Sequence, residues 1–248
     1  MEVIIKANER IDDLQCKGLR IIQNVEGFCF GVDAVLLSNF AEVKNNQRVI
    51  DLGTGTGIIP ILIAGKTRAA EVVGIEIQEQ IAQMAGRSII LNNLEERVKI
   101  VNEDIKNISS LYGKESFDVV TTNPPYKHSG SGLVNPEDTK AISRHEIMCT
   151  LEDVIAASSA LLKNNGRFFM VHRPERIVDI LTLMRSYKLE PKRLRFVHPY
   201  PNKKPNLLLI EGLKYGKAFL NFMDPLYIHD DSGNYTQEIN DIYGRDVL

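Results

Sequence analysis

Four consecutive residues, Asn123, Pro124, Pro125 and Tyr126, combine two hydrogen-bond acceptors with an aromatic ring. They follow the apolar run 117–122, which predicts a strand that must end there, because proline lacks an N–H donor and fixes φ. The Asn123 side-chain oxygen and the Pro124 carbonyl can each accept one hydrogen of a planar NH2 group, while Tyr126 stacks on the ring that carries it. The four residues are therefore candidate catalytic residues for chemistry on an aromatic amine, although a proline-rich turn with a surface tyrosine would contain the same residues.

A glycine-rich turn, 53–57, stands earlier in the chain between the apolar strand pattern 48–52 and the helix pattern 58–66. Glycines let the backbone approach a ligand closely, and a helix N-terminus offers unpaired N–H groups. The spacing GxGxG differs from the GxGxxG of dinucleotide-binding folds. Asp51, just before the turn, would repel a pyrophosphate and attract a cationic amino-acid group. The turn therefore predicts a cofactor that carries such a group.

Two further acids stand at or just after the ends of predicted strands, much as Asp51 does. Glu76 ends the pattern 71–76, a position from which a carboxylate holds ribose hydroxyls, and Asp104 follows the pattern 98–101, where it or its neighbouring backbone can reach an adenine. Each could instead be a helix cap or a solvated loop acid, but their order after Asp51 favours binding. The predicted cofactor-binding residues are Asp51, Gly53, Thr54, Gly55, Gly57, Glu76, Ile77, Asp104, Ile105 and Asn123.

The elements that must position these residues alternate between strand and helix patterns. Strands are expected at 3–5, 19–23, 166–171, 194–197 and 207–210, and helices at 34–41, 78–92, 151–162 and 177–187. Asp33 is expected as the N-cap of the helix 34–41, with closure of the pocket as its alternative role. Gly166 is expected as the C′ glycine after the helix 151–162. The tail shows a turn at 231–234 and a short helix capped by Thr236, with no evident chemistry.

The segment from Val49 to about Glu211 resembles the class I S-adenosylmethionine-dependent methyltransferases. DLGTGTG matches their first motif, VVGIEI the second, NEDI the third, and NPPY the fourth motif of the branch that methylates amino groups. The resemblance implies a Rossmann-like α/β fold: a mostly parallel, seven-stranded sheet with a terminal antiparallel hairpin and helices on both faces. It also implies S-adenosylmethionine as the cofactor and methyl transfer as the reaction.

The similarity extends over nearly the full length to the bacterial tRNA(Val) adenine-N(6) methyltransferases, through FGVDAVLLSNFA, AISRHE, VHRPER and HPYPNKKPNLLLIEGLKYGK. It implies methylation of the adenosine beside the anticodon, with the adenine flipped into a pocket between the glycine turn and NPPY. The expected partner is the anticodon stem-loop of the tRNA, and the expected oligomeric state is a monomer. The candidate RNA contacts are Lys127, Arg144, Arg173, Lys203 and Lys204, and His145 and His172 are expected to be structural or to contact phosphates.

Other functions share parts of this pattern. Methylation of a protein glutamine amide uses the same NPPY for the same physical reason, although such enzymes usually carry a helical N-terminal domain and fewer than fifty residues precede Val49, where the resemblance begins here. Methylation of a guanine amino group in rRNA is a further alternative, as is a cofactor-binding scaffold without catalysis. Retention of Asp51, Glu76 and Asn123 together argues against the scaffold.

Composition sets the remaining limits. The 248 residues suit one large domain, divided here into an N-terminal extension (1–45), a methyltransferase core (46–215) and an acidic C-terminal extension (216–248). The net charge is −2, yet 184–215 is locally basic and is expected, with the loop lysines, to contact the tRNA backbone. Cysteines at 16, 29 and 149 have no metal-binding spacing, so no metal is expected, and the lack of a leader or apolar span predicts a cytoplasmic protein.

Overall fold

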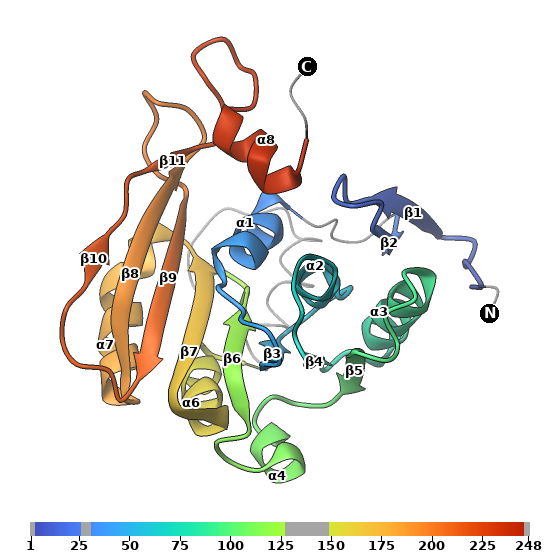
Figure 1. Ribbon diagram of the computed structural model, residues 1–248, viewed down its shortest axis with the longest axis horizontal. Coiled ribbons are helices and arrows are strands. Elements are labelled where there is room, and N and C mark those ends of the chain that lie inside the picture. The colour runs from blue at the N-terminus through green and yellow to red at the C-terminus, as the bar shows by residue number, and fades with distance from the viewer. Residues whose placement is uncertain (1–2, 26–30, 127–148, 246–248) are drawn as a thin grey trace, which may run out of the picture.

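Parallel strands alternating with helices form the centre of the molecule (Figure 1). The computed structural model describes residues 3–25, 31–126 and 149–245. One sheet has the order β10-β8-β9-β7-β6-β3-β4-β5, with β11 paired to β8. Its strands are β3 (Arg48–Leu52), β4 (Glu71–Glu76), β5 (Val98–Asn102), β6 (Phe117–Thr122), β7 (Leu162–His172), β8 (Leu189–His198), β9 (Leu207–Lys214), β10 (Asn221–Phe222) and β11 (Leu226–Tyr227).

The predicted mostly parallel sheet with a terminal antiparallel hairpin is confirmed. Strands β3, β4, β5, β6 and β7 are parallel where they pair, and β9 runs antiparallel to both β7 and β8. The sheet has nine strands rather than seven, because the two-residue strands β10 and β11 add to β8. Since the carboxyl ends of parallel strands meet at one edge, Leu52, Glu76 and Thr122 lead into the same side of the molecule.

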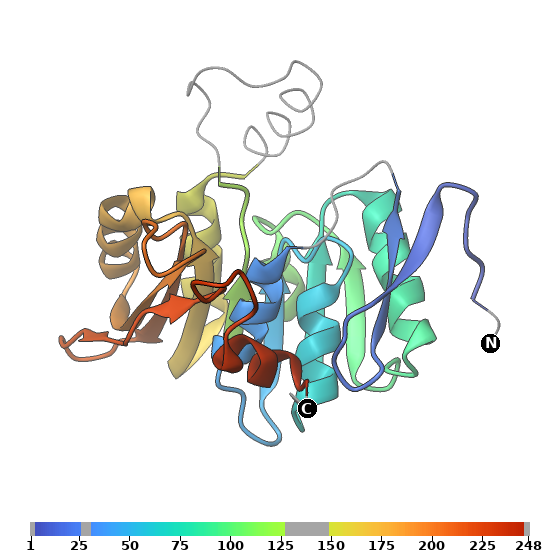
Figure 2. The same ribbon diagram turned by 90° about the horizontal axis from the view of Figure 1, so that it is seen from above.

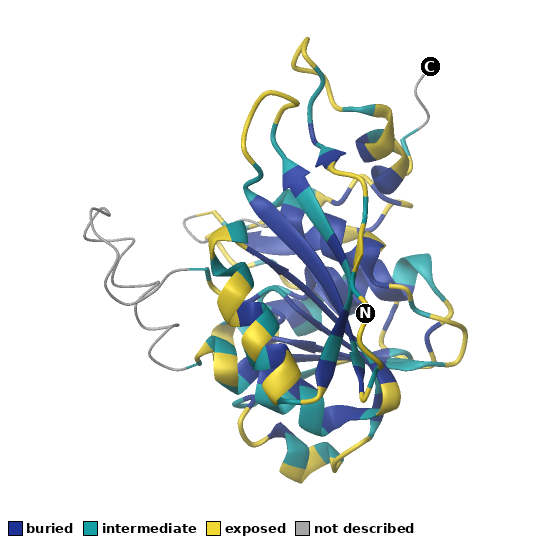
Figure 3. Ribbon diagram, turned by 90° about the vertical axis from the view of Figure 1, so that its left-hand side faces the viewer, coloured by how far each residue is buried: buried dark blue, intermediate teal, exposed yellow. Residues whose placement is uncertain are grey.

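Helices cover both faces of the sheet, as predicted (Figure 1). One face carries α1 (Val32–Phe40), α2 (Ile58–Lys66) and α3 (Glu79–Leu91). The other carries α4 (Ile108–Tyr112), α6 (Leu151–Leu161) and α7 (Ile177–Ser186), which follows the short helix η1 (Pro174–Arg176). Figure 3 shows the resulting burial, with dark strands at the centre and exposed outer helix faces. This two-sided burial explains why β3, β4 and β6 read as continuous apolar runs.

The two ends of the chain add small elements at the outside of the sheet (Figure 2). The hairpin of β1 (Glu9–Asp13) and β2 (Arg20–Asn24) lies on α3, where Ser88 Oγ accepts from the Ile22 N–H at 3.0 Å and the Asn92 amide binds the main chain of Arg20. Near the C-terminus, α8 (Gln237–Tyr243) packs beside α1, and Lys66 Nζ donates to the Ile242 carbonyl at 3.0 Å.

Several local predictions were wrong. The first strand is Glu9–Asp13 rather than 3–5, and Ile4 is largely exposed. Gly166 does not end a helix: α6 ends at Leu161 and passes directly into β7, whose pairing with β6 is irregular before Arg167. A Cβ on Gly166 would lie 2.8 Å from the Lys163 carbonyl oxygen, so the glycine serves this irregular strand segment. The short helix capped by Thr236 is confirmed.

Among the helices in the described part of the chain, none is both long and apolar enough to cross a bilayer.

Candidate active site

The glycine turn adopts the left-handed backbone conformation at three positions. Gly53, Gly55 and Gly57 have φ values of +72°, +56° and +86°. A Cβ built on Gly53 or Gly55 would meet nothing within 4 Å, so both residues border open space, whereas a Cβ on Gly57 would lie 3.2 Å from the Ala85 side chain. Gly57 therefore permits α3 to approach the turn, and the other two glycines leave room beside it for a ligand.

Asp51 is fully buried, one residue before the end of β3 and close to this turn. Its Oδ1 accepts from the Thr121 hydroxyl at 2.7 Å. Among the described residues, its Oδ2 and the buried Thr54 hydroxyl make no well-aligned hydrogen bond, although this hydroxyl lies near enough to the carboxyl to lower its pKa. Burial raises the pKa of Asp51 from its ordinary 3.8 to about 7. Buried polar atoms normally have partners, so these two atoms mark a place where a ligand can supply hydrogen bonds.

Glu76 is held at the end of β4 by backbone donors from both sides. Its Oε2 accepts from the Gly55 N–H at 3.0 Å and its Oε1 from the Gln78 N–H at 2.9 Å. The Asn102 amide donates to the carbonyls of Glu76 and Ile77 at 2.8 and 2.9 Å, which ties the ends of β4 and β5 together. The carboxylate therefore has a fixed position against the glycine turn.

The third predicted acid lies in a local turn after β5. Asp104 Oδ1 accepts from the Lys106 N–H at 2.9 Å, a contact that a loop acid makes without any ligand. Ile105 is buried in the core beneath it, while Ile77 at the end of β4 is partly exposed. The position of Asp104 therefore fits both a solvated loop acid and a residue that reaches the adenine.

NPPY follows β6, and its polar side chains meet Asp33 from the first turn of α1. Asn123 Nδ2 donates to Asp33 Oδ2 at 3.1 Å. The Tyr126 hydroxyl lies 2.7 Å from the same Asp33 oxygen and 2.5 Å from Asn123 Oδ1, and its single hydrogen can be donated to only one of them at a time. Pro124 is buried and Pro125 is exposed.

The prediction that Asp33 caps α1 was wrong. The N-cap is Gly31 and no side chain caps it; Asp33 lies inside the first turn with 8% of its surface exposed. Its alternative role, at the pocket, matches where the carboxylate lies. Because a carboxylate only accepts hydrogen bonds, it fixes the Asn123 amide with the NH2 toward Asp33 and the oxygen away from it.

The Tyr126 ring contacts two consecutive residues at the end of β7, His172 and Arg173. Its centroid lies 5.3 Å from that of His172 in an edge-to-face arrangement, and the Arg173 guanidinium lies over the ring at 5.0 Å. Burial and the Asp33 carboxyl raise the pKa of Tyr126, so its hydroxyl stays protonated. Burial lowers the pKa of His172 to about 4, and its Nδ1 accepts from the Arg173 N–H at 2.8 Å. His172 is therefore neutral at physiological pH and packs beside the Tyr126 ring.

The predicted RNA contacts divide into three groups. Arg173 lies over Tyr126 and donates from Nη1 to the Asn206 carbonyl at 2.9 Å. Lys203 and Lys204 are exposed in the loop between β8 and β9. Lys127, Arg144 and the histidine at 145 lie outside the described residues.

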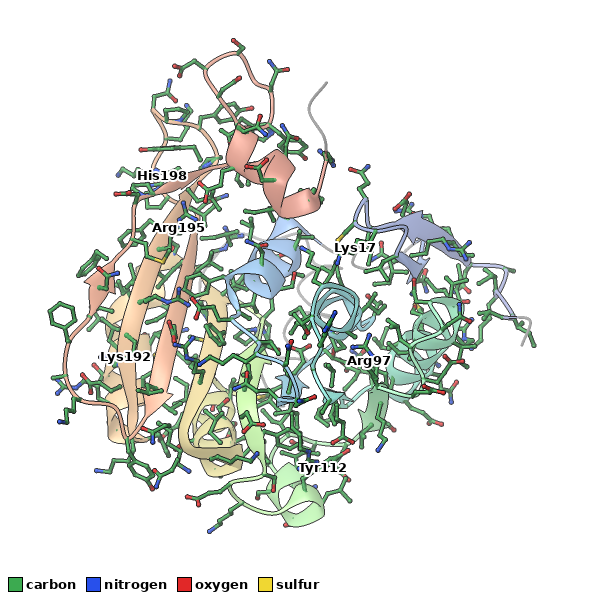
Figure 4. All side chains as sticks on the ribbon, in the orientation of Figure 1. Lys17, Arg97, Tyr112, Lys192, Arg195 and His198 are labelled. Atoms are coloured by element: carbon green, nitrogen blue, oxygen red, sulfur yellow. The ribbon has the colours of Figure 1, made fainter. Side chains whose placement is uncertain are left out.

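Most cations of the locally basic stretch contact protein acceptors instead of solvent. Arg193 binds Glu42 and Glu211, and Arg195 binds Glu238 at 2.6 and 2.9 Å. Figure 4 places Lys192 and Arg195 along β8; Lys192 donates to two carbonyls, those of Lys217 and Phe219. Glu42 and Glu238 come from distant parts of the chain, so a count of charges along 184–215 overstated the cationic surface.

Within the residues that the structure describes, no group of three or more His, Cys, Asp or Glu side chains is arranged to hold a metal ion.

Comparison with known proteins adds sequence relatives to this geometry. A family model described as "Methyltransferase small domain" matches residues 31–186. A tRNA1(Val) (adenine(37)-N6)-methyltransferase of Porphyromonas gingivalis is 32% identical over 216 residues, covering 84% of each chain. A protein of the same name from Bacteroides thetaiotaomicron is 30% identical over 181 residues, covering 73% of this chain and 74% of its own.

Solved structures show the same fold. A predicted O-methyltransferase, Atu636 from Agrobacterium tumefaciens, has a TM-score of 0.71 at 24% identity, covering 86% of this chain and 95% of its own. Trm5 from Methanocaldococcus jannaschii, solved in complex with adenosine, has a TM-score of 0.60 at 15% identity, covering 86% and 57%. At these identities the likeness concerns the arrangement of the sheet and its helices.

Proposed function

The chain belongs to the methyltransferase small-domain family and is an S-adenosylmethionine-dependent methyltransferase, and we propose that it methylates the exocyclic amino group of an adenine in tRNA. The proposed target is the adenosine beside the anticodon of tRNA(Val), which the names of the sequence relatives support. The observation that carries the choice of an amino group is the Asn123 amide, because Asp33 fixes it with its oxygen on the far side, where it can accept an N–H once the Tyr126 hydroxyl has released it.

The residues around the glycine turn suit S-adenosylmethionine. Within the described residues, Asp51 Oδ2 and the Thr54 hydroxyl make no well-aligned hydrogen bond, and Gly53 and Gly55 border open space. Asp51 would receive the cationic amino-acid end, and Glu76 the ribose hydroxyls. Ile77, Asp104 and Ile105 are proposed for the adenine end. S-adenosylmethionine supplies an electrophilic methyl group on a positively charged sulfur.

Asn123 and Pro124 are proposed to orient the substrate amine. Their two oxygens accept the two amino hydrogens, which points the nitrogen lone pair toward the methyl donor. The Tyr126 hydroxyl must then leave Asn123 Oδ1, and Asp33 Oδ2, at 2.7 Å, is the acceptor that takes it. This exchange keeps every polar group paired while the oxygen becomes available to substrate. Positioning supplies most of the rate. The nitrogen that gains the methyl group loses one proton after the transfer, and this proton passes to solvent, so the neutral His172 is not required as a base.

The target base must leave the RNA stack to reach this site. Extrusion costs a few kcal/mol, and stacking on an aromatic ring offsets about 1–3 kcal/mol of it. Tyr126 is proposed as that ring; since Arg173 lies over one face, the base takes the opposite face or displaces the guanidinium. Arg173, Lys203 and Lys204 are proposed for the tRNA backbone, and Lys127 and Arg144 stay predictions.

We also propose that the chain consists of a core and two extensions. The β1–β2 hairpin and α8 attach to the outside of the core by contacts such as Lys66 to the Ile242 carbonyl, which supports extensions at 1–45 and 216–248 around the core 46–215. Residues of α1 nevertheless belong to the buried cluster of the core, so this helix is the firmest part of the first extension. A monomer working in the cytoplasm on the anticodon stem-loop is the arrangement that we propose.

Affinity for S-adenosylmethionine is expected to rise with pH, because Asp51 must be ionised to hold an ammonium group. With a pKa of about 7 in the free protein, the carboxyl is mostly protonated at pH 5.5, so affinity should increase about tenfold between pH 5.5 and 7. Taken by itself, the raised pKa of Asp51 lowers the free energy of unfolding of the free protein as pH rises from about 4 to 7. Calorimetric titration across this range measures the effect; Asp51→Asn should bind weakly and without the pH dependence, and an unchanged slope in that variant would contradict the assignment.

Substrate class is tested by offering unmodified bulk tRNA, rRNA and a glutamine-containing protein separately with labelled S-adenosylmethionine. Label confined to tRNA would support the proposal, and mapping by nuclease protection should place it beside the anticodon. Label on the protein or on guanine in rRNA would replace the proposal by the corresponding alternative, since any planar NH2 group fits the two acceptors at 123 and 124.

A further inference from the structure

A column of stacked rings joins the β8–β9 loop to the C-terminal tail. Tyr200 stacks on His229 with centroids 4.9 Å apart and planes 22° apart, and His229 stacks on Tyr235 at 5.1 Å and 19°. Tyr235 continues onto Tyr243 at 6.3 Å and 24°. The Arg245 guanidinium lies over the rings of Tyr235 and Tyr243 at 5.2 and 4.5 Å. Tyr200 belongs to the β8–β9 loop, and the other three rings belong to the C-terminal tail.

Hydrogen bonds fix the column at the loop. The His229 N–H and its ring Nδ1 both lie 3.1 Å from the Pro199 carbonyl oxygen, so Nδ1 carries a hydrogen and donates it. An isolated bridge pairs His229 with Tyr235. Because these contacts hold the rings in register before any ligand arrives, the column is preorganised.

Tyr200 is the end of the column that faces out of the protein. It is 37% exposed, and among the described residues the only ring stacked on it is His229. Lys203 and Lys204 are exposed three and four positions further along, and the Lys203 N–H closes the turn by donating to the Tyr200 carbonyl at 3.1 Å. The loop therefore presents a ring and two cations together.

This loop is linked to the candidate active site. Arg173, whose guanidinium lies over Tyr126, donates to the Asn206 carbonyl at 2.9 Å, just before β9. Figure 4 shows His198 at the end of β8, where the loop begins beside the tail. The nearby Asp230 carboxylate is engaged within the tail's own turn, where its Oδ1 accepts from the N–H groups of Ser232 and Asn234 at 2.9 and 3.0 Å.

We propose that Tyr200 is a stacking platform for an unpaired base of the RNA substrate, separate from the base that enters the NPPY pocket, with Lys203 and Lys204 on the adjoining phosphates. A rigid ring beside cations is the combination by which proteins bind single-stranded nucleic acid. The inference rests on the proposed function, because it takes the loop of a tRNA as the ligand. It gives the C-terminal tail a role, which is to hold Tyr200 through His229.

The test is RNA binding by the full chain without a methyl donor. The probe is an unmodified tRNA(Val) anticodon stem-loop with one 2-aminopurine at each loop position in turn. Wild-type protein should quench the fluorescence at one position other than the target adenine, because stacking quenches 2-aminopurine. Tyr200→Leu should abolish that quenching and weaken binding about tenfold, whereas Tyr200→Phe should preserve both.

Two controls make the result specific. Tyr215→Leu removes another exposed tyrosine, just after the far end of β9, and should change neither quenching nor affinity. Equal thermal midpoints and equal S-adenosylmethionine affinity establish that Tyr200→Leu is folded. An unaltered quenching profile and affinity in the folded Tyr200→Leu variant would overturn the stacking site.

Methyl transfer by the wild type is scored separately, so that the two claims fail differently. Transfer to tRNA without any effect of Tyr200 overturns only the stacking site. Quenching that depends on Tyr200, in a protein that transfers no methyl group to tRNA, supports the stacking site and overturns only the proposed reaction.

Discussion

Replacing Asn123 by alanine is expected to lower methyl transfer to tRNA about a thousandfold and to leave the affinity for S-adenosylmethionine nearly unchanged. The substitution removes the oxygen that accepts an amino hydrogen, and with it the orientation of the lone pair. Single-turnover transfer of labelled methyl groups measures the first effect and calorimetry the second. A variant that keeps a tenth of the wild-type rate would contradict the assigned role, and a large loss of cofactor affinity would move Asn123 to the cofactor site.

Asp33→Asn is the companion variant, because it leaves Asn123 in place and removes only what orients it. An asparagine at 33 can donate as well as accept, so the Asn123 amide is free to turn over. The expected loss is about tenfold in the single-turnover rate. The control is Asn39→Ala, at an exposed position on the same helix, which should retain the wild-type rate.

Glu76→Ala is expected to weaken S-adenosylmethionine binding about a hundredfold. The carboxylate would accept two ribose hydroxyls, and hydrogen bonds to charged groups contribute about 1.5–3 kcal/mol each. It also accepts from the Gly55 N–H, so its loss loosens the turn that borders the ligand. Calorimetric affinity is the measurement.

Two further variants separate charge from general effects on α3. Glu76→Gln keeps an acceptor and should fall between the wild type and alanine. Glu79→Ala removes an exposed acid three positions later, in the first turn of α3, and should bind as the wild type does. Wild-type affinity in Glu76→Ala would exclude the carboxylate from the cofactor site.

Much of the fold was predictable because local sequence determines it. The run 48–52 is apolar because β3 is covered on both faces, and the glycines at 53, 55 and 57 are required by positive φ. The strand, the turn and the helix that follows can therefore be predicted from the local sequence alone. The hairpin of β8 and β9 was predicted in the right place but too short, because charged residues such as Lys192 and Arg193 lie in the part of β8 that precedes Leu194. The partner of Arg193, Glu42, is distant in sequence.

The part of the candidate site that could not be predicted depends on long-range contacts. Asp33 stands before an apolar helix pattern, where a cap is the simplest interpretation, and its partner Asn123 is 90 residues away. The ring column could not be predicted either, because no sequence period links the tyrosines at 200, 235 and 243 with the histidine at 229. Tertiary packing alone brings these side chains together, so a sequence read element by element does not show them.

The most direct test of the account is the nucleoside that receives the methyl group. Purified protein is incubated with labelled S-adenosylmethionine and tRNA that lacks the modification, the RNA is digested, and the labelled nucleoside is identified by chromatography and mass. We predict a single labelled product, N(6)-methyladenosine, which Asn123→Ala does not form. A label on another nucleoside, or none in tRNA while the protein binds the cofactor, would contradict methylation of an adenine amino group at NPPY.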